Sequence, residues 1–187
     1  MVKKNSCIFI SGNGSNLKKL LHRASLYHFP INIKMIVSNK KNANGLIYAK
    51  RYSVPHFIID TENKLSEIKI LNELKKRKVT LICLAGYMKI LSKFFINSFQ
   101  NKIINIHPSI LPKFKGINTF TKVLRNSEIK TGCTVHFVNN KLDSGKIILN
   151  KKFFINKRDN VRSLKKKTQY LEYFAYSEAI IKIYNYS

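Results

Sequence analysis

The chain has 187 residues, of which 44% are hydrophobic and 24% charged, a composition typical of an ordinary globular domain. No apolar run approaches the roughly 20 residues that cross a bilayer, which excludes a membrane-spanning helix. The first apolar run, Cys7–Ile10, ends at a Gly-rich segment and is therefore predicted to be a strand rather than part of a signal peptide. Three widely spaced cysteines (Cys7, Cys83 and Cys133) are flanked by apolar residues, so we expect buried thiols in a reducing, cytoplasmic setting.

The formal net charge of +26 raises the possibility of a nucleic-acid partner. Only 6 of the 35 basic residues are arginine, whereas nucleic-acid sites favour arginine for bidentate contacts. The lysines are spread along the chain, and the abundance of Lys, Asn and Ile is what an AT-rich genome would produce. We therefore predict no nucleic-acid partner and interpret the charge as compositional bias with a modest attraction for anionic substrates. An RNA-binding role is the main non-enzymatic alternative.

Strands and helices are predicted to alternate over the first 107 residues. The predicted strands cover residues 6–10, 31–39, 56–60, 80–86 and 102–107. The predicted helices, recognised by apolar residues about 3.6 positions apart, cover residues 15–28, 42–54, 63–79 and 91–100, the last with Ser92 as its N-cap. This alternation indicates an α/β fold with an open, mostly parallel, doubly wound (Rossmann-like) sheet flanked by helices.

The pattern changes after Gly116. Two strands, at residues 131–139 and 145–155, are predicted to be joined by the turn NKLDS and to form an antiparallel extension after about residue 130. A long helix from Arg158 to about Tyr184 is predicted to follow. Neither a repeat nor a linker interrupts the chain, so residues 1–187 are expected to form a single domain.

The stretch SGNGSN, residues 11–16, lies between the first predicted strand and the first helix. Glycines allow the backbone to approach a ligand closely, and the N–H groups at a helix start attract anions. The pattern has neither the third glycine of a dinucleotide fingerprint nor the lysine of a P-loop. It suits a single phosphate, and a plain tight turn between strand and helix is the alternative.

Asn105 and His107 lie two residues apart near the end of a predicted strand, so their side chains point to the same face. In open parallel sheets, ligands bind at the carboxyl ends of the strands. Asn offers a hydrogen-bond donor to a carbonyl oxygen, and His can donate a proton near neutral pH. Pro108 and Pro112 stiffen the following loop. A capping Asn beside a structural His is the alternative.

Asp143 lies in the segment LDSG between the two late strands and is one of only nine acidic residues. A carboxylate there could orient or charge a nearby histidine, although Asp and Gly also favour turns for local reasons. The remaining histidines are expected to be structural, namely His22, His28, His56 and His136.

Together these stretches resemble the phosphoribosylglycinamide formyltransferases, the folate-dependent enzymes of purine synthesis. The resemblance is collinear over nearly the whole chain. It rests on the segments ISGNGSNL, LAGYMKILS, NIHPSILPKFKG, GCTVHFVNNKLDSGKIIL and TQYLEYFAYSEAI. The combination of N-x-H-P-S-x-L-P with a later L-D-x-G is the most specific of these features.

The resemblance implies a role for each matched residue, with residues 1–100 as a phosphate-binding half and 101–187 as a catalytic and folate-binding half. The catalytic residues would be Asn105, His107 and Asp143. The substrate phosphate would be held by Gly14, Ser15 and Asn16, and the substrate amine by Glu172. The co-substrate 10-formyltetrahydrofolate would contact Met88, Lys89, Ile90, Leu91 and Asn105.

The implied reaction transfers the formyl group to the amine of glycinamide ribonucleotide through a tetrahedral oxyanion, with no metal. Asn105 and His107 would donate hydrogen bonds to the oxyanion, a contribution of about 3–4 kcal/mol for each well-placed donor, and Asp143 would assist. The family often has Arg at Lys89, and its folate-tail contact falls near Asn63 or Lys64.

Two related activities use the same chemistry with another acceptor, namely methionyl-tRNA formyltransferases and formyltetrahydrofolate hydrolases. Enzymes of both kinds have an additional domain that is not expected in this chain, so we expect the ribonucleotide to be the acceptor here. We expect a monomer or a homodimer.

Overall fold

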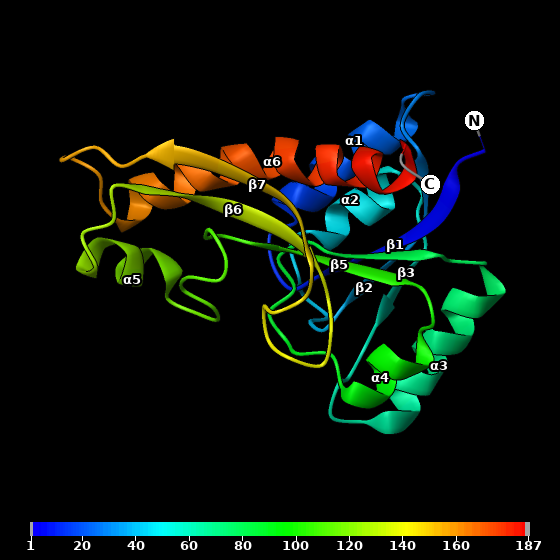
Figure 1. Ribbon diagram of the computed structural model, residues 1–187. Helices are drawn as coiled ribbons and strands as arrows, with labels where there is room; N and C mark the ends of the chain where they lie inside the picture. The colour runs from blue at the N-terminus through cyan, green and yellow to red at the C-terminus, as the bar shows by residue number, and fades with distance from the viewer. Residues whose placement is uncertain (1, 186–187) are drawn as a thin grey trace. The chain divides into compact units, whose positions relative to one another are not determined.

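The computed structural model describes residues 2–185 (Figure 1). The chain is divided into two compact units, and the boundary falls between Ile104 and Asn105, inside a strand. Among the described helices, none combines the length and apolarity that a membrane span requires.

The first unit is built on four parallel strands. They are β1 (Lys4–Ile10), β2 (Ile31–Ser38), β3 (His56–Ile58) and β4 (Leu81–Leu84), with β1 paired to both β2 and β4. The helices are α1 (Ser15–Ser25), α2 (Leu46–Arg51), α3 (Lys64–Lys76) and α4 (Lys93–Ser98). The run Cys7–Ile10 has no exposed surface. Such a continuous buried run is typical of a parallel strand covered on both faces, which explains why the sequence shows no alternation there.

Sequence capping signals account for two helix starts in this unit. Ser92 accepts a hydrogen bond from the N–H of Phe95 at the start of α4, as predicted. Asn63 accepts from the N–H groups of Leu65 and Ser66 at the start of α3. Each side chain therefore satisfies backbone donors that a helix terminus leaves unpaired.

The second unit contains an antiparallel pair covered by a long helix. After β5 (Lys102–His107) come α5 (Thr119–Arg125), β6 (Lys130–Phe137), β7 (Ile147–Phe154) and α6 (Val161–Asn185). β6 pairs with β7 in antiparallel register, and α6 packs along both strands, as Figure 1 shows. The approach of β6 and β7 is close at Gly132, where an added Cβ would lie 1.8 Å from the carbonyl oxygen of Lys151.

The strand order of the sheet is β3-β2-β1-β4-β5-β6-β7. The predicted α/β fold, with a mostly parallel sheet and an antiparallel extension, is therefore confirmed. The helix α5 was not predicted. It is only seven residues long and begins after Asn118 in the left-handed conformation (φ 58°), without a side-chain cap, so neither periodicity nor a capping motif marked it.

All three cysteines are free and buried. Cys7 and Cys83 lie in the first unit and Cys133 in the second, each with no exposed surface. Burial raises the pKa of Cys7 well above its usual range, and burial together with the negative charge of Glu172 raises that of Cys133 to about 12. The thiols of Cys7 and Cys133 are therefore uncharged at neutral pH.

Candidate functional site

Three residues predicted to be catalytic meet in the second unit. Asn105 and His107 leave the same face of β5, Asp143 reaches His107 from the connection between β6 and β7, and Asn105 joins them through His136. Asp143 adopts the left-handed backbone conformation (φ 45°), which turns its carboxylate inward so that only 8% of the residue is exposed. His107 is buried to a similar degree, with 5% exposed. The turn that was predicted from LDSG thus delivers a buried carboxylate.

The Asp143 carboxylate lies between two imidazole rings. Its Oδ2 atom accepts a hydrogen bond from the N–H of Gly116 at 2.9 Å and lies 3.2 Å from Nδ1 of His107. Its Oδ1 atom lies 3.6 Å from Nε2 of His136. Burial raises the pKa of Asp143, but the His136 ring, the Gly116 N–H and His107 together outweigh it, so the net shift is downward. Asp143 is therefore ionised at neutral pH.

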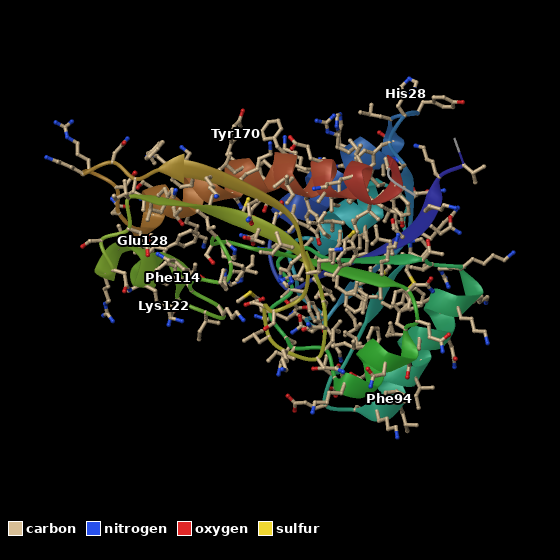
Figure 2. All side chains as sticks on the ribbon, viewed as in Figure 1. His28, Phe94, Phe114, Lys122, Glu128 and Tyr170 are labelled. Carbon is tan, nitrogen blue, oxygen red and sulfur yellow. The ribbon has the colours of Figure 1, made fainter. Side chains whose placement is uncertain are left out.

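Both ring nitrogens of His107 face acceptors. Nδ1 faces Asp143, and Nε2 lies 2.9 Å from the carbonyl oxygen of Phe114, a residue also held in the left-handed conformation. Burial lowers the pKa of His107, and the charges of His136 and Lys122 act in the same direction. The Phe114 carbonyl and Asp143 oppose this shift without outweighing it. Figure 2 labels Phe114 and Lys122 in this part of the chain.

The lowered pKa of His107 predicts a specific pH dependence of stability. As the pH falls through about 6.5, the usual pKa of histidine, the unfolded chain binds a proton before folded His107 does. The contribution of His107 to the free energy of unfolding should therefore fall between about pH 7.5 and pH 5.5. Asp143 does not add to this change, because a lowered carboxyl pKa acts only near or below about pH 4.

Urea denaturation of the wild type and of His107→Asn at both pH values measures this contribution as a difference. We expect the wild type to lose more stability than the variant on acidification. Equal losses would show that the pKa of His107 is the same in the folded and unfolded chains.

His136 belongs to this cluster, although we expected it to be only structural. The residue is 2% exposed on β6, and its Nε2 atom lies 3.3 Å from Nδ2 of Asn105. Its Nδ1 atom lies 2.8 Å from the carbonyl oxygen of Phe137. The available signal was a histidine between two apolar residues of a predicted strand, where a buried imidazole needs polar partners.

The expected phosphate loop lies in the first unit, between β1 and α1. Gly14 precedes the helix with φ 69°, and a Cβ at this position would lie 2.7 Å from Cα of Gly45. Both the positive φ and the close approach of the two loops require glycine here. Ser15 and Asn16 open the helix, where backbone N–H groups and the helix dipole favour an anion.

The expected folate segment is anchored to the start of the same loop region. The N–H of Met88 donates to Oγ of Ser11 at 2.7 Å. Met88 and Ile90 are 70% and 71% exposed, whereas Leu91 is buried at 4%. Lys89 donates to a carboxylate oxygen of Glu62 at 2.9 Å. The segment therefore presents two apolar side chains to solvent beside a buried leucine.

The other expected contacts come from α6 and from the start of α3. Glu172 is half-buried on α6, where its charge acts on Cys133. Asn63 caps α3, and the Nζ of Lys64 lies 5.0 Å from the centre of the Phe94 ring. Within residues 2–185, no group of three or more His, Cys, Asp or Glu side chains is arranged to hold a metal ion.

Comparison with known proteins gives a consistent result. Residues 4–180 match the family model described as formyl transferase. A phosphoribosylglycinamide formyltransferase of Haemophilus influenzae is 37% identical over 92% of this chain and 84% of its own length. A trifunctional purine biosynthetic protein of Chironomus tentans is 36% identical over 95% of the chain, which spans 13% of that protein.

Solved structures agree with the sequence relatives. The crystal structure of phosphoribosylglycinamide formyltransferase from Brucella melitensis superimposes with a TM-score of 0.90 at 32% identity, covering 99% of this chain and 97% of that one. The chain belongs to the formyl transferase family.

Proposed function

We propose that this chain is a phosphoribosylglycinamide formyltransferase, which transfers the formyl group of 10-formyltetrahydrofolate to the amine of glycinamide ribonucleotide in purine synthesis. Residues 1–187 would act as one catalytic domain in the cytoplasm, as a monomer or a homodimer. Two relatives, each matched over most of its own length, are named phosphoribosylglycinamide formyltransferases. The observation that carries the proposal is the cluster of half-buried Asn105 with buried His107 and Asp143, in which Asn105 and His107 are donors that suit a developing oxyanion.

In the proposed reaction, the primary amine of the ribonucleotide attacks the formyl carbon, a C–N bond forms, and the carbonyl electrons move to oxygen. Asn105 donates an amide N–H to this oxyanion, and His107 donates from Nε2. The carbonyl of Phe114 already holds the acceptor position at Nε2, 2.9 Å away. The formyl oxygen, which is also a carbonyl oxygen, would take that position. The lowered pKa makes protonated His107 a stronger acid and hence a better donor.

The proton balance is assigned to Asp143 with His107. The attacking amine becomes positively charged and must lose a proton before the product amide is complete. Ionised Asp143 receives that proton through water, and His107 beside it can share the proton at 3.2 Å. The oxyanion then re-forms the carbonyl, the bond between that carbon and the folate nitrogen breaks, and the nitrogen takes up the proton that Asp143 received. Neither a metal nor a covalent enzyme intermediate is part of this scheme.

Phosphate and pterin binding are assigned to residues of the first unit, and amine binding to Glu172 of the second. Gly14, Ser15 and Asn16 would hold the ribonucleotide phosphate, and the segment Met88–Leu91 would hold the pterin ring. Glu172 would contact the amine end of the glycinamide. The bond between Ser11 and Met88 ties the beginning of one loop to the other.

The phosphate assignment predicts a change confined to ribonucleotide binding. Ser15→Ala combined with Asn16→Ala removes two polar side chains near the anion, and hydrogen bonds to charged groups contribute about 1.5–3 kcal/mol. We expect the KM for the ribonucleotide to rise at least about tenfold, with kcat within about threefold of the wild type. Steady-state kinetics with each substrate varied in turn measures both constants.

Asn13→Ala is the matched control, because Asn13 is exposed in the same loop and pairs with Asn44. This variant should leave both KM values unchanged. A selective rise in the folate KM for the double variant would show that the two binding assignments are exchanged.

The proposed function is tested by offering three formyl acceptors to the purified protein with 10-formyltetrahydrofolate. These are glycinamide ribonucleotide, water and initiator methionyl-tRNA, and the folate product is followed by its absorbance. Turnover that depends on the ribonucleotide supports the proposal. Turnover with tRNA or water would support formyl transfer by this site but would show that the acceptor is not the ribonucleotide. Absence of turnover with all three, in a folded protein that binds RNA steeply with falling salt, would support the RNA-binding alternative.

A further inference from the structure

The arrangement around His136 restricts where its proton can lie. A carbonyl oxygen only accepts hydrogen bonds, so the 2.8 Å contact with the Phe137 carbonyl places an N–H on Nδ1 of His136. In the neutral ring, Nε2 then carries a lone pair. Because Nδ2 of Asn105 lies 3.3 Å from this atom and Oδ1 of Asp143 lies farther away, at 3.6 Å, Nε2 of the neutral ring accepts one of the two amide hydrogens, and only the protonated ring would donate to Asp143 and lower its pKa. The backbone of β6 thereby sets the tautomer, and the tautomer sets what Asn105 can donate to.

An asparagine side chain has two ends of nearly equal size and opposite hydrogen-bonding character. Turned one way it presents N–H groups to a substrate, and turned the other way it presents a carbonyl oxygen. A carbonyl oxygen facing the formyl oxygen would repel the charge that develops there. The amide of Asn105 therefore needs a partner that fixes its orientation, and an unprotonated Nε2 of His136, 3.3 Å from Nδ2, is such a partner.

We propose that His136 is a positioning residue of the formyl transfer reaction: as the neutral Nδ1–H tautomer, it accepts one amide hydrogen of Asn105 and leaves the second for the formyl oxygen. This inference rests on the proposed function, in which Asn105 is the oxyanion donor. His136 itself would not touch the substrate and would act only through Asn105.

Protonation of His136 would reverse this arrangement. A proton on Nε2 would meet the amide nitrogen of Asn105, two donors facing each other, and would turn the ring contact toward Asp143 Oδ1, now 3.6 Å away. The charged and titratable groups that face or act on this cluster are Asp143 from the β6–β7 connection, His107 from β5 and Lys122 from α5. Protonated His136 would also compete with His107 for the single carboxylate.

Two substitutions of similar shape separate the positioning role from simple packing. His136→Gln keeps an acceptor able to reach Asn105, whereas His136→Met fills the same space without one. We expect His136→Met to lower kcat about 10- to 100-fold, less than the about 10²- to 10³-fold loss of an oxyanion donor itself. His136→Gln should recover most of this loss, and the KM for the ribonucleotide should change little in either variant.

A double-mutant cycle shows whether the effect passes through Asn105. In an Asn105→Ala background, His136→Met should cost less than about threefold further, because no amide remains to be positioned. Equal losses in both backgrounds, or equal losses for Gln and Met, would overturn the proposal and leave a packing role. The cycle uses whichever acceptor the wild type accepts.

A measurement on the wild type keeps the inference testable without turnover. The ¹⁵N chemical shifts of the imidazole rings distinguish a protonated from an unprotonated nitrogen. We expect His136 to show an unprotonated Nε2 and a protonated Nδ1 at neutral pH. A protonated Nε2 would overturn the positioning role, even if the protein transfers formyl groups. The expected tautomer in a protein without formyl transfer would overturn the proposed function instead.

Discussion

Replacing His107 by alanine is expected to lower kcat for formyl transfer by about 10³-fold. The change removes the donor from Nε2 and separates Asp143 from the ring nitrogen that lies 3.2 Å away. Loss of one oxyanion donor costs about 10²- to 10³-fold, and loss of a positioned acid or base costs about 10²- to 10⁴-fold. The two losses are not additive, because His107 and Asp143 act as one unit. Initial rates with saturating substrates measure the effect.

His56→Ala is the matched control for this experiment, because His56 is an exposed histidine on β3. This variant should retain full activity. Circular dichroism and a urea midpoint for both variants separate lost chemistry from lost folding. Near-normal turnover by a folded His107→Ala protein would remove His107 from the proposed mechanism.

Gly132→Ala is expected to destabilise the fold strongly. The added methyl group would lie 1.8 Å from the backbone carbonyl oxygen of Lys151 on the paired strand, closer than any real Cβ contact. Backbone on both sides of this contact belongs to the β6–β7 ladder, so neither strand can move without breaking its register. We expect a loss of at least about 3 kcal/mol, at the upper end of what overpacking costs. At that size the urea midpoint falls by about 1 M.

Gly12→Ala provides the comparison within the same chain. No atom lies within 4 Å of a Cβ built on Gly12, so the substitution should change the free energy of unfolding by less than about 0.5 kcal/mol. If Gly132→Ala were as mild as Gly12→Ala, β6 and β7 would have to be further apart than they are here.

Much of the fold could be predicted because its signals are local. The buried run of β1, the spacing of α1 and the Ser92 cap of α4 each follow from a few neighbouring residues. α5 could not be predicted in this way. Its start depends on a left-handed Asn118, a backbone conformation that no residue pattern in the chain announces.

In the candidate site, too, only the features with local signals could be predicted. Asn105 and His107 were expected on one face because strand geometry places residues i and i+2 together. The partners of that pair lie outside the strand, 31 residues along the chain from Asn105 to His136 and 7 from His107 to the Phe114 carbonyl. Every residue has a backbone carbonyl, so the sequence cannot indicate which one accepts from His107, and this acceptor could be found only in the structure. The same holds for the Phe137 carbonyl and the tautomer of His136.

The three buried cysteines give each unit its own reporter. Thiol reagents react with the exposed thiolate, and in the folded chain all three cysteines are buried with no exposed surface. Labelling can therefore proceed only when the surrounding backbone opens. Modification of Cys7 and Cys83 records openings of the first unit, and modification of Cys133 records openings of the second. Mass spectrometry of a timed labelling reaction thus measures the rate of local opening of each unit separately, from a single sample and without any engineered probe.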